Sequence, residues 1–139
     1  RKASAVLDRL DLKDGDRLLE IGCGWGALGK AALERADIDY TGLTLSQEQK
    51  ALADIRLAPW AARDKARIHL SDYRDADGAH DAIVSVEMVE GVGQSYWPDY
   101  IATLHRLLKP GGKASLQFIV MNDAVFESYA ANTDFIQTY

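Results

Sequence analysis

Short apolar runs alternate with longer amphipathic stretches along the whole chain. The apolar runs have the length of buried strands, and glycine-rich or polar breaks separate them from the stretches that follow. Strands that alternate with helices predict βαβ units, in which a parallel sheet is covered by helices on both faces. The five predicted strands are residues 17–21, 38–43, 66–70, 82–86 and 113–121.

The first two helices are predicted between the early strands. Residues 27–36 are rich in alanine and leucine, which favour helix. The next helix opens at Ser46, whose hydroxyl can form a capping box with the glutamine three residues later, Gln49. We expect that helix to end near Pro59.

The second half of the chain predicts one clear helix and one partial one. A helix starts after Ser95, with Pro98 in its first turn, where a missing N–H costs little. The Lys-Pro-Gly-Gly run at 109–112 should stop it. Residues 126–135 are expected to be helical in part.

The strongest motif is the run Glu-Ile-Gly-Cys-Gly-Trp-Gly at 20–26, between the first strand and the first of these helices. Glycines in such a loop allow a tight turn and let a ligand approach the backbone closely. Ligands of parallel sheets bind at the carboxyl ends of the strands. The loop therefore predicts a cofactor site at that edge.

Two cofactor classes fit this loop. Gly22, Gly24 and Ala27 satisfy the dinucleotide pattern, but the second strand does not end in the acidic residue that would bind the ribose hydroxyls. The alternative pattern, an acid followed by three alternate glycines, resembles the first motif of S-adenosylmethionine-dependent methyltransferases. Glu20 and Gly26 favour this second interpretation.

Several side chains near the strand ends suit that cofactor, which carries a ribose diol, an adenine and a sulfonium. Thr44 and Gln49 can reach the ribose, and Asp72 can accept from the adenine amino group. Tyr73 offers a stacking face. Other roles remain open. Gln49 can simply complete the helix cap, and Asp72 and Tyr73 can be ordinary loop residues. Cys23, between two glycines, is interpreted as a small packed residue.

Composition narrows the class of protein further. The chain has 139 residues, 47% of them apolar and 27% charged, which fits one globular domain. Its net charge of −5 does not indicate nucleic-acid binding. No apolar stretch is long enough for a membrane helix, and no signal peptide is visible. One cysteine and three scattered histidines predict neither a disulfide nor a metal site.

The chain resembles one particular family, the cyclopropane fatty acid synthases and mycolic acid cyclopropane synthases. Trp25 within the glycine loop and the Gly-Leu-Thr-Leu-Ser run at 42–46 are its more specific features. The resemblance covers essentially the whole chain. Its motifs are residues 20–26, 41–49, 72–75, 84–93, 107–112 and 133–137.

The resemblance implies a Rossmann-like class I methyltransferase core. It implies methyl transfer from S-adenosylmethionine to the double bond of an unsaturated fatty acyl chain on a phospholipid, giving a cyclopropane through a carbocation that a held base deprotonates. The expected catalytic residues are Glu90, beside a bicarbonate ion, and Gln117. The expected cofactor-binding residues are Glu20, Gly22, Gly24, Gly26, Thr44, Leu45, Gln49, Asp72, Tyr73 and Arg74.

The catalytic assignments leave alternatives. Glu90 can be a solvated loop carboxylate, and Glu87 follows the same strand and could act in its place. Gln117 and Gly91 stand where many bacterial members have histidine, and these departures put in question how the base is held and which product forms.

The same resemblance implies a domain organisation, a binding partner and a cellular location. Members are much longer, and their sheet has seven strands, so we expect residues 1–139 to be the cofactor-binding core of a longer enzyme. The expected partner is an unsaturated phospholipid at the membrane surface, with a homodimer formed through other segments. The expected location is the cytoplasm, peripheral to the inner membrane surface. Competing functions are small-molecule N- or O-methyl transfer, synthesis of methylene- or methyl-branched fatty acids, a non-catalytic binding module and, more distantly, a dinucleotide oxidoreductase.

Overall fold

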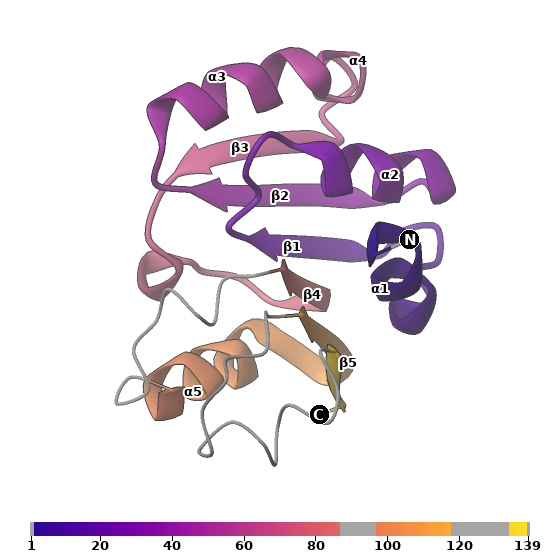
Figure 1. Cartoon of the computed structure of the whole chain (residues 1–139). Helices are drawn as coiled ribbons and strands as arrows, with labels where there is room; N and C mark the ends of the chain where they lie inside the picture. Colours follow the sequence, from indigo (N-terminus) through magenta and orange to yellow (C-terminus); the bar gives the residue numbers. More distant parts are fainter. Residues whose placement is uncertain (1, 87–96, 118–133, 139) are drawn as a thin grey trace.

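A single mixed sheet organises the chain (Figure 1). The computed structural model describes residues 2–86, 97–117 and 134–138. Within these ranges six strands pair in the order β3-β2-β1-β4-β5-β6. β1 to β5 are parallel, and β6 runs antiparallel to β5. The strands are β1 (Arg17–Ile21), β2 (Asp39–Thr44), β3 (Ala66–Leu70), β4 (His80–Val86), β5 (Leu108–Gln117) and β6 (Asp134–Thr138).

Helices connect the parallel strands, as crossovers between parallel strands require. Among the described helices, none is both long and apolar enough to span a membrane. The helices are α1 (Lys2–Leu10), α2 (Ala27–Arg35), α3 (Gln47–Arg56), α4 (Ala58–Ala61), the short 3₁₀ helix η1 (Tyr73–Asp75) and α5 (Trp97–Leu107).

Two hydrophobic cores lie on opposite faces of the sheet, because successive residues of a strand point to opposite sides. In β1, Leu18 belongs to the core under α1, α2 and α3, whereas Leu19 and Ile21 belong to the core under α5. α5 contributes Tyr100 and Leu104 to that second core. The predicted α/β architecture with helices on both faces is therefore confirmed.

The predicted strands 17–21 and 66–70 have the bounds of β1 and β3, while β2 and β4 differ from their predictions by one or two residues. The helix that opens at Ser46 ends at Arg56, close to the predicted stop. The chain then makes one more turn, α4, which has Pro59 in its first turn. Proline is tolerated there because that N–H has no partner within a helix.

The predicted start of the fifth strand is wrong by several residues. α5 ends at Leu107, as the Lys-Pro-Gly-Gly run predicts, but β5 begins at the next residue and includes that run. The pairing with β4 shifts register between His80 and Ala82, and Gly111 adopts a φ of +82°. This irregularity lets a proline- and glycine-containing segment join the sheet.

The C-terminal segment also differs from its prediction. Asp134 and Phe135 were expected at the end of a partly helical stretch, and they lie in β6 instead. Residues 126–133 of that stretch lie outside the described residues. β6 forms against Lys113–Gln117 of β5, so a partner about twenty residues away decides its structure, which local sequence patterns do not report. The sheet thus has six described strands where the sequence predicted five.

Candidate functional site at the carboxyl edge of the sheet

The loop after β1 makes the tight turn that its glycines predict. Gly22, Gly24 and Gly26 all adopt positive φ, at 75°, 55° and 87°. Residues with a side chain rarely adopt such angles, so the three glycines determine the path of the chain into α2. The predicted glycine loop is confirmed as a local structure.

The loop is fastened to the neighbouring strand. The backbone N–H groups of Gly22 and Cys23 both donate to the carbonyl oxygen of Leu43 in β2, at 2.9 and 2.8 Å. A Cβ at Gly26 would lie 3.1 Å from Cβ of Ala53, whereas a Cβ at Gly24 would meet nothing within 4 Å. Gly26 therefore serves close packing against α3, and Gly24 leaves open space in which a ligand can approach the backbone.

Thr44 and Gln49 form one hydrogen-bonded unit beside this loop. Thr44 ends β2, and its Oγ1 donates to Oε1 of Gln49 at 3.1 Å. Ser46 caps α3 as predicted, since its Oγ accepts from the Gln49 N–H at 3.2 Å. Gln49 Oε1 bonds to Thr44 instead of completing the capping box. The two residues predicted for the ribose are thus brought together at the strand end.

Large apolar side chains are exposed around the same edge. Leu45, directly after β2, is 69% exposed, and Trp25 of the glycine loop is 48% exposed. Leu70, at the end of β3, is also exposed. Leu52 and Ile55 of α3 are exposed as well, so exposure alone does not mark the edge as a binding surface.

The segment after β3 holds a tight acid–base pair. Asp72 Oδ1 accepts from the Arg74 backbone N–H at 2.8 Å, and its Oδ2 accepts from Nη2 of Arg74 at 2.9 Å. These bonds hold the pKa of the Asp72 carboxyl below its usual range. A carboxylate has about four acceptor positions, so Asp72 keeps capacity for a further donor.

Tyr73 lies in the core and not on an open surface. Its ring is 8% exposed and packs edge to face against Tyr100 of α5, with centroids 5.1 Å apart. That contact explains its burial. Arg106 of α5 fixes the same segment, donating to the carbonyl oxygens of Ala76 at 2.9 Å and Arg74 at 3.4 Å. The sequence analysis missed Arg106, because nothing in the local pattern links α5 to this turn.

Glu20 points into the core beneath the loop, and its predicted part in binding the cofactor stays a prediction. It is 3% exposed, and its Oε1 accepts from the hydroxyl of Tyr40 at 2.5 Å. Burial raises the pKa of Glu20 to about 8. A buried carboxyl group needs a hydrogen-bond partner, and the hydroxyl of Tyr40 supplies one. The sequence analysis did not single out Tyr40.

Cys23 is packed, as interpreted from the sequence. It is buried in the core under α2, and burial raises the pKa of its thiol to about 12. A thiol with so high a pKa is a poor nucleophile near neutral pH.

Of the two predicted catalytic residues, the structure describes only the backbone of Gln117. Glu90 lies outside the described residues. The backbone of Gln117 ends β5 at the carboxyl edge, where it pairs in register with Val86 at the end of β4. The backbone of Gln117 thus lies at the carboxyl edge, and its catalytic role stays a prediction. In the described part of the chain, no group of three or more histidine, cysteine or acidic residues is placed to hold a metal ion.

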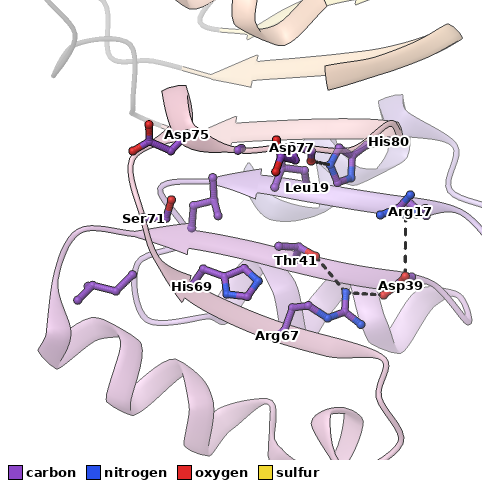
Figure 2. A pocket seen from close by; sticks show the side chains of 13 residues that line it. Arg17, Leu19, Asp39, Thr41, Arg67, His69, Ser71, Asp75, Asp77 and His80 are labelled. Carbon is purple, nitrogen blue, oxygen red and sulfur yellow. Dashed lines mark hydrogen bonds and ion pairs between the residues drawn. The ribbon is translucent and has the colours of Figure 1, made fainter. Parts of the chain in front are cut away.

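A groove of about 630 Å³ lies elsewhere, over β1, β2 and β3 (Figure 2). None of the predicted site residues that the structure describes lines it. Its two arginines are both near Asp39: Nη1 of Arg67 lies 2.6 Å from Oδ1, and Nε of Arg17 lies 4.0 Å from Oδ2. Because the arginines share one carboxylate on a polar surface, this groove does not resemble an anion site.

The fold and the glycine loop together define a Rossmann-like methyltransferase core. The family model for mycolic acid cyclopropane synthetase matches residues 1–139. The chain belongs to this family.

Similar proteins agree with this assignment. Tuberculostearic acid methyltransferase UfaA1 of Mycobacterium tuberculosis is 45% identical over 122 residues, which is 87% of this chain and 28% of that protein. Cyclopropane-fatty-acyl-phospholipid synthase of Escherichia coli K12 is 40% identical over 111 residues, 80% of this chain and 28% of that protein. The chain thus spans less than a third of either relative.

Solved structures show the same fold. The cyclopropane synthase MmaA2 from Mycobacterium tuberculosis superposes with a TM-score of 0.79 at 32% identity, covering 84% of this chain and 41% of that one. The mycolic acid cyclopropane synthase CmaA1, complexed with SAH and CTAB, gives a TM-score of 0.78 at 33% identity, with the same coverage.

Proposed function

We propose that the chain is the cofactor-binding core of an S-adenosylmethionine-dependent methyltransferase that modifies double bonds in the acyl chains of phospholipids. The whole-chain match to the mycolic acid cyclopropane synthetase family carries this proposal. The relative named cyclopropane-fatty-acyl-phospholipid synthase, 40% identical to the chain, supports the acceptor class.

The described residues fit the proposed cofactor. When bound, S-adenosylmethionine supplies an electrophilic methyl group on a sulfonium. The open side of Gly24 lets the backbone approach it, and the Thr44 hydroxyl orients the amide of Gln49, whose nitrogen would donate to a ribose hydroxyl. Leu45 offers an apolar surface that the adenosine would cover. Asp72, kept ionised by Arg74, is suited to accept from the adenine amino group.

The chemistry at the acceptor needs an anion near the carboxyl ends of β4 and β5. An alkene is a weak nucleophile, so it must be held close to the methyl group. Transfer leaves a carbocation, which a fixed negative charge stabilises. We assign Glu90, four residues after β4, to hold the base, for which bicarbonate is the candidate. A base held there would take a proton from the new methyl group, and the electron pair of that C–H bond would close the ring. Gln117, at the end of the adjacent strand, is proposed to line this site.

A branched product is the second candidate. The 45% identity to tuberculostearic acid methyltransferase favours it. In that case a hydride shift moves the positive charge to the carbon that carries the new methyl group, and loss of a methyl proton leaves a methylene branch. A methyl branch then requires a later reduction of that methylene by a separate hydride donor. Both products need the enzyme to meet phospholipid at a membrane surface, and we propose a peripheral cytoplasmic location and a homodimer for the whole protein.

The test uses the full-length protein, S-adenosylmethionine and vesicles of unsaturated phospholipid, with the fatty acids analysed by mass spectrometry. Gain of one CH₂ unit is expected, and its fragmentation pattern distinguishes a ring from a branch. Glu90→Gln should lose the product, while Glu87→Gln, the matched control after the same strand, should keep it. Cofactor binding without any change in the lipid would overturn the acyl-chain proposal and direct attention to amine acceptors.

A further inference from the structure

The buried pair formed by Tyr40 and Glu20 lies directly under the glycine loop. Tyr40 is fully buried on β2, and Glu20 is buried on β1, two residues before Gly22. Tyr40 pairs with Leu18, and Glu20 pairs with Gly42. The tyrosine hydroxyl therefore reaches a carboxyl group two residues further along the strands.

Two glycines provide the space that this reach requires. A Cβ at Gly42 would lie 2.7 Å from the Tyr40 hydroxyl oxygen, and a Cβ at Gly29 of α2 would lie 2.5 Å from Cζ of the same ring. Real Cβ atoms do not approach other atoms so closely. The ring therefore runs between the helix and the sheet through a gap that only glycines at both positions leave open.

The same contacts connect the pair to the loop. A Cβ at Gly42 would lie 3.0 Å from Cβ of Cys23, so the loop rests on the strand residue over which the tyrosine passes. The next strand residue, Leu43, accepts the two hydrogen bonds that fasten the loop. Any tilt of the Tyr40 ring or release of Glu20 would change the surface that supports Cys23 and the start of α2.

We propose that Tyr40 is a positioning residue for the cofactor. It does not contact the ligand; its hydroxyl holds Glu20, and the pair keeps the glycine loop in its binding geometry. This inference rests on the proposed function, since it assumes that the loop binds S-adenosylmethionine.

The binding test compares Tyr40→Phe with Tyr100→Phe in the full-length protein. Tyr100 is equally buried but lies in the core on the opposite face of the sheet, so its change removes the same hydroxyl away from the loop. By calorimetry, Tyr40→Phe should raise the Kd for S-adenosylmethionine about tenfold, as expected for an unpaired buried polar group, while Tyr100→Phe stays within about twofold of wild type. In turnover, KM for the cofactor should rise while kcat and KM for the lipid change little.

A double variant tests whether the tyrosine acts through the carboxylate. Glu20→Met has similar length and no charge, and combined with Tyr40→Phe it replaces both partners by apolar groups of similar shape. The double variant should bind within about threefold of wild type, better than either single variant. Failure to recover would mean that Glu20 itself serves the cofactor, and it would overturn the proposal.

Cys23 gives a second readout that needs no ligand, when its labelling in the full-length protein is followed on its own peptide by mass spectrometry. Labelling of the buried Cys23 thiol reports opening of the loop, and Tyr40→Phe should accelerate it about tenfold relative to Tyr100→Phe. If Tyr40→Phe shows the same Cys23 labelling rate and the same Kd for S-adenosylmethionine as the wild-type protein, the inference is overturned. If wild-type protein fails to bind S-adenosylmethionine, the proposed function is wrong, and the labelling rate alone still decides whether Tyr40 holds the loop.

Discussion

Gly29 of α2 and Tyr40 of β2 fit together so closely that a single added methyl group would collide with the tyrosine ring. The Cβ of an alanine at position 29 would lie 2.5 Å from Cζ and 2.7 Å from the hydroxyl oxygen of Tyr40. Glycine inside a helix is unfavourable by about 1 kcal/mol relative to alanine. The tyrosine explains why the helix nevertheless has glycine there.

Gly29→Ala should therefore destabilise the protein, although alanine is the better helix former. Overpacking against Tyr40 is expected to lower the free energy of unfolding by about 1–3 kcal/mol in urea denaturation. Tyr40→Leu provides the control background, because a shorter side chain leaves room for the methyl group. In that background Gly29→Ala should be neutral or stabilising. Equal destabilisation in both backgrounds would show that the ring is not the cause.

Glu20 should make stability fall as pH rises. Burial raises its pKa from 4.5 to about 8, so between these values the folded state keeps a proton that the unfolded state has released. The favourable contribution is complete below about pH 4.5 and is lost as the pH rises through 8, with a slope of up to about 1.4 kcal/mol per pH unit.

The measurement for Glu20 is urea denaturation between pH 5 and 9. Glu20→Gln, which keeps an acceptor for Tyr40 but cannot ionise, should reduce the loss of stability over this range. The exposed Glu34→Gln in α2 is the control and should follow the wild-type curve. A Glu20→Gln curve parallel to wild type would mean that the carboxylate is solvated and not buried.

Thr44→Val should weaken cofactor binding by more than it weakens the fold. The change removes the hydroxyl that donates to Gln49 Oε1, so the amide loses the bond that orients it. We expect Kd for S-adenosylmethionine to rise about tenfold. Ser46→Ala is the control, because it removes the cap of α3 and should cost about 1 kcal/mol of stability with a smaller effect on affinity. If Ser46→Ala raised the Kd for S-adenosylmethionine more than Thr44→Val did, the proposed role of Thr44 would be contradicted.

Arg106→Gln should loosen the segment that carries Asp72 and Tyr73. The arginine donates to the carbonyl oxygens of Arg74 and Ala76, and glutamine is too short to restore both bonds. We expect a loss of about 1 kcal/mol in stability and a rise of about threefold in the Kd for S-adenosylmethionine. Arg56→Gln, at an exposed position at the end of α3, is the control for the loss of charge. If Arg106→Gln left the Kd for S-adenosylmethionine unchanged, the segment with Asp72 and Tyr73 would not be part of the cofactor site.

Much of the fold could be predicted from the sequence because its signals are local. The alternation of apolar runs and helices predicts β1 to β4 and α2, α3 and α5, and glycines at alternate positions predict the turn after β1. A helix cap is also a local interaction, so Ser46 was identified correctly. The placement of Thr44, Asp72 and Gln117 near the carboxyl edge follows from the parallel topology alone.

Tertiary structure decided what depends on residues far apart in the chain. β6 forms because β5 offers it a partner, and Glu20 lies in the core because Tyr40, twenty residues later, satisfies its carboxylate. Tyr73 is buried because α5 brings Tyr100 against it. Local pattern shows which residues a strand or loop contains, but burial and hydrogen-bond partners across the sheet arise only when the chain is folded. The sequence by itself therefore determined the class of fold and the edge of the sheet at which the candidate site lies. The folded chain decided which of the candidate side chains are exposed at that edge and which are buried beneath the loop.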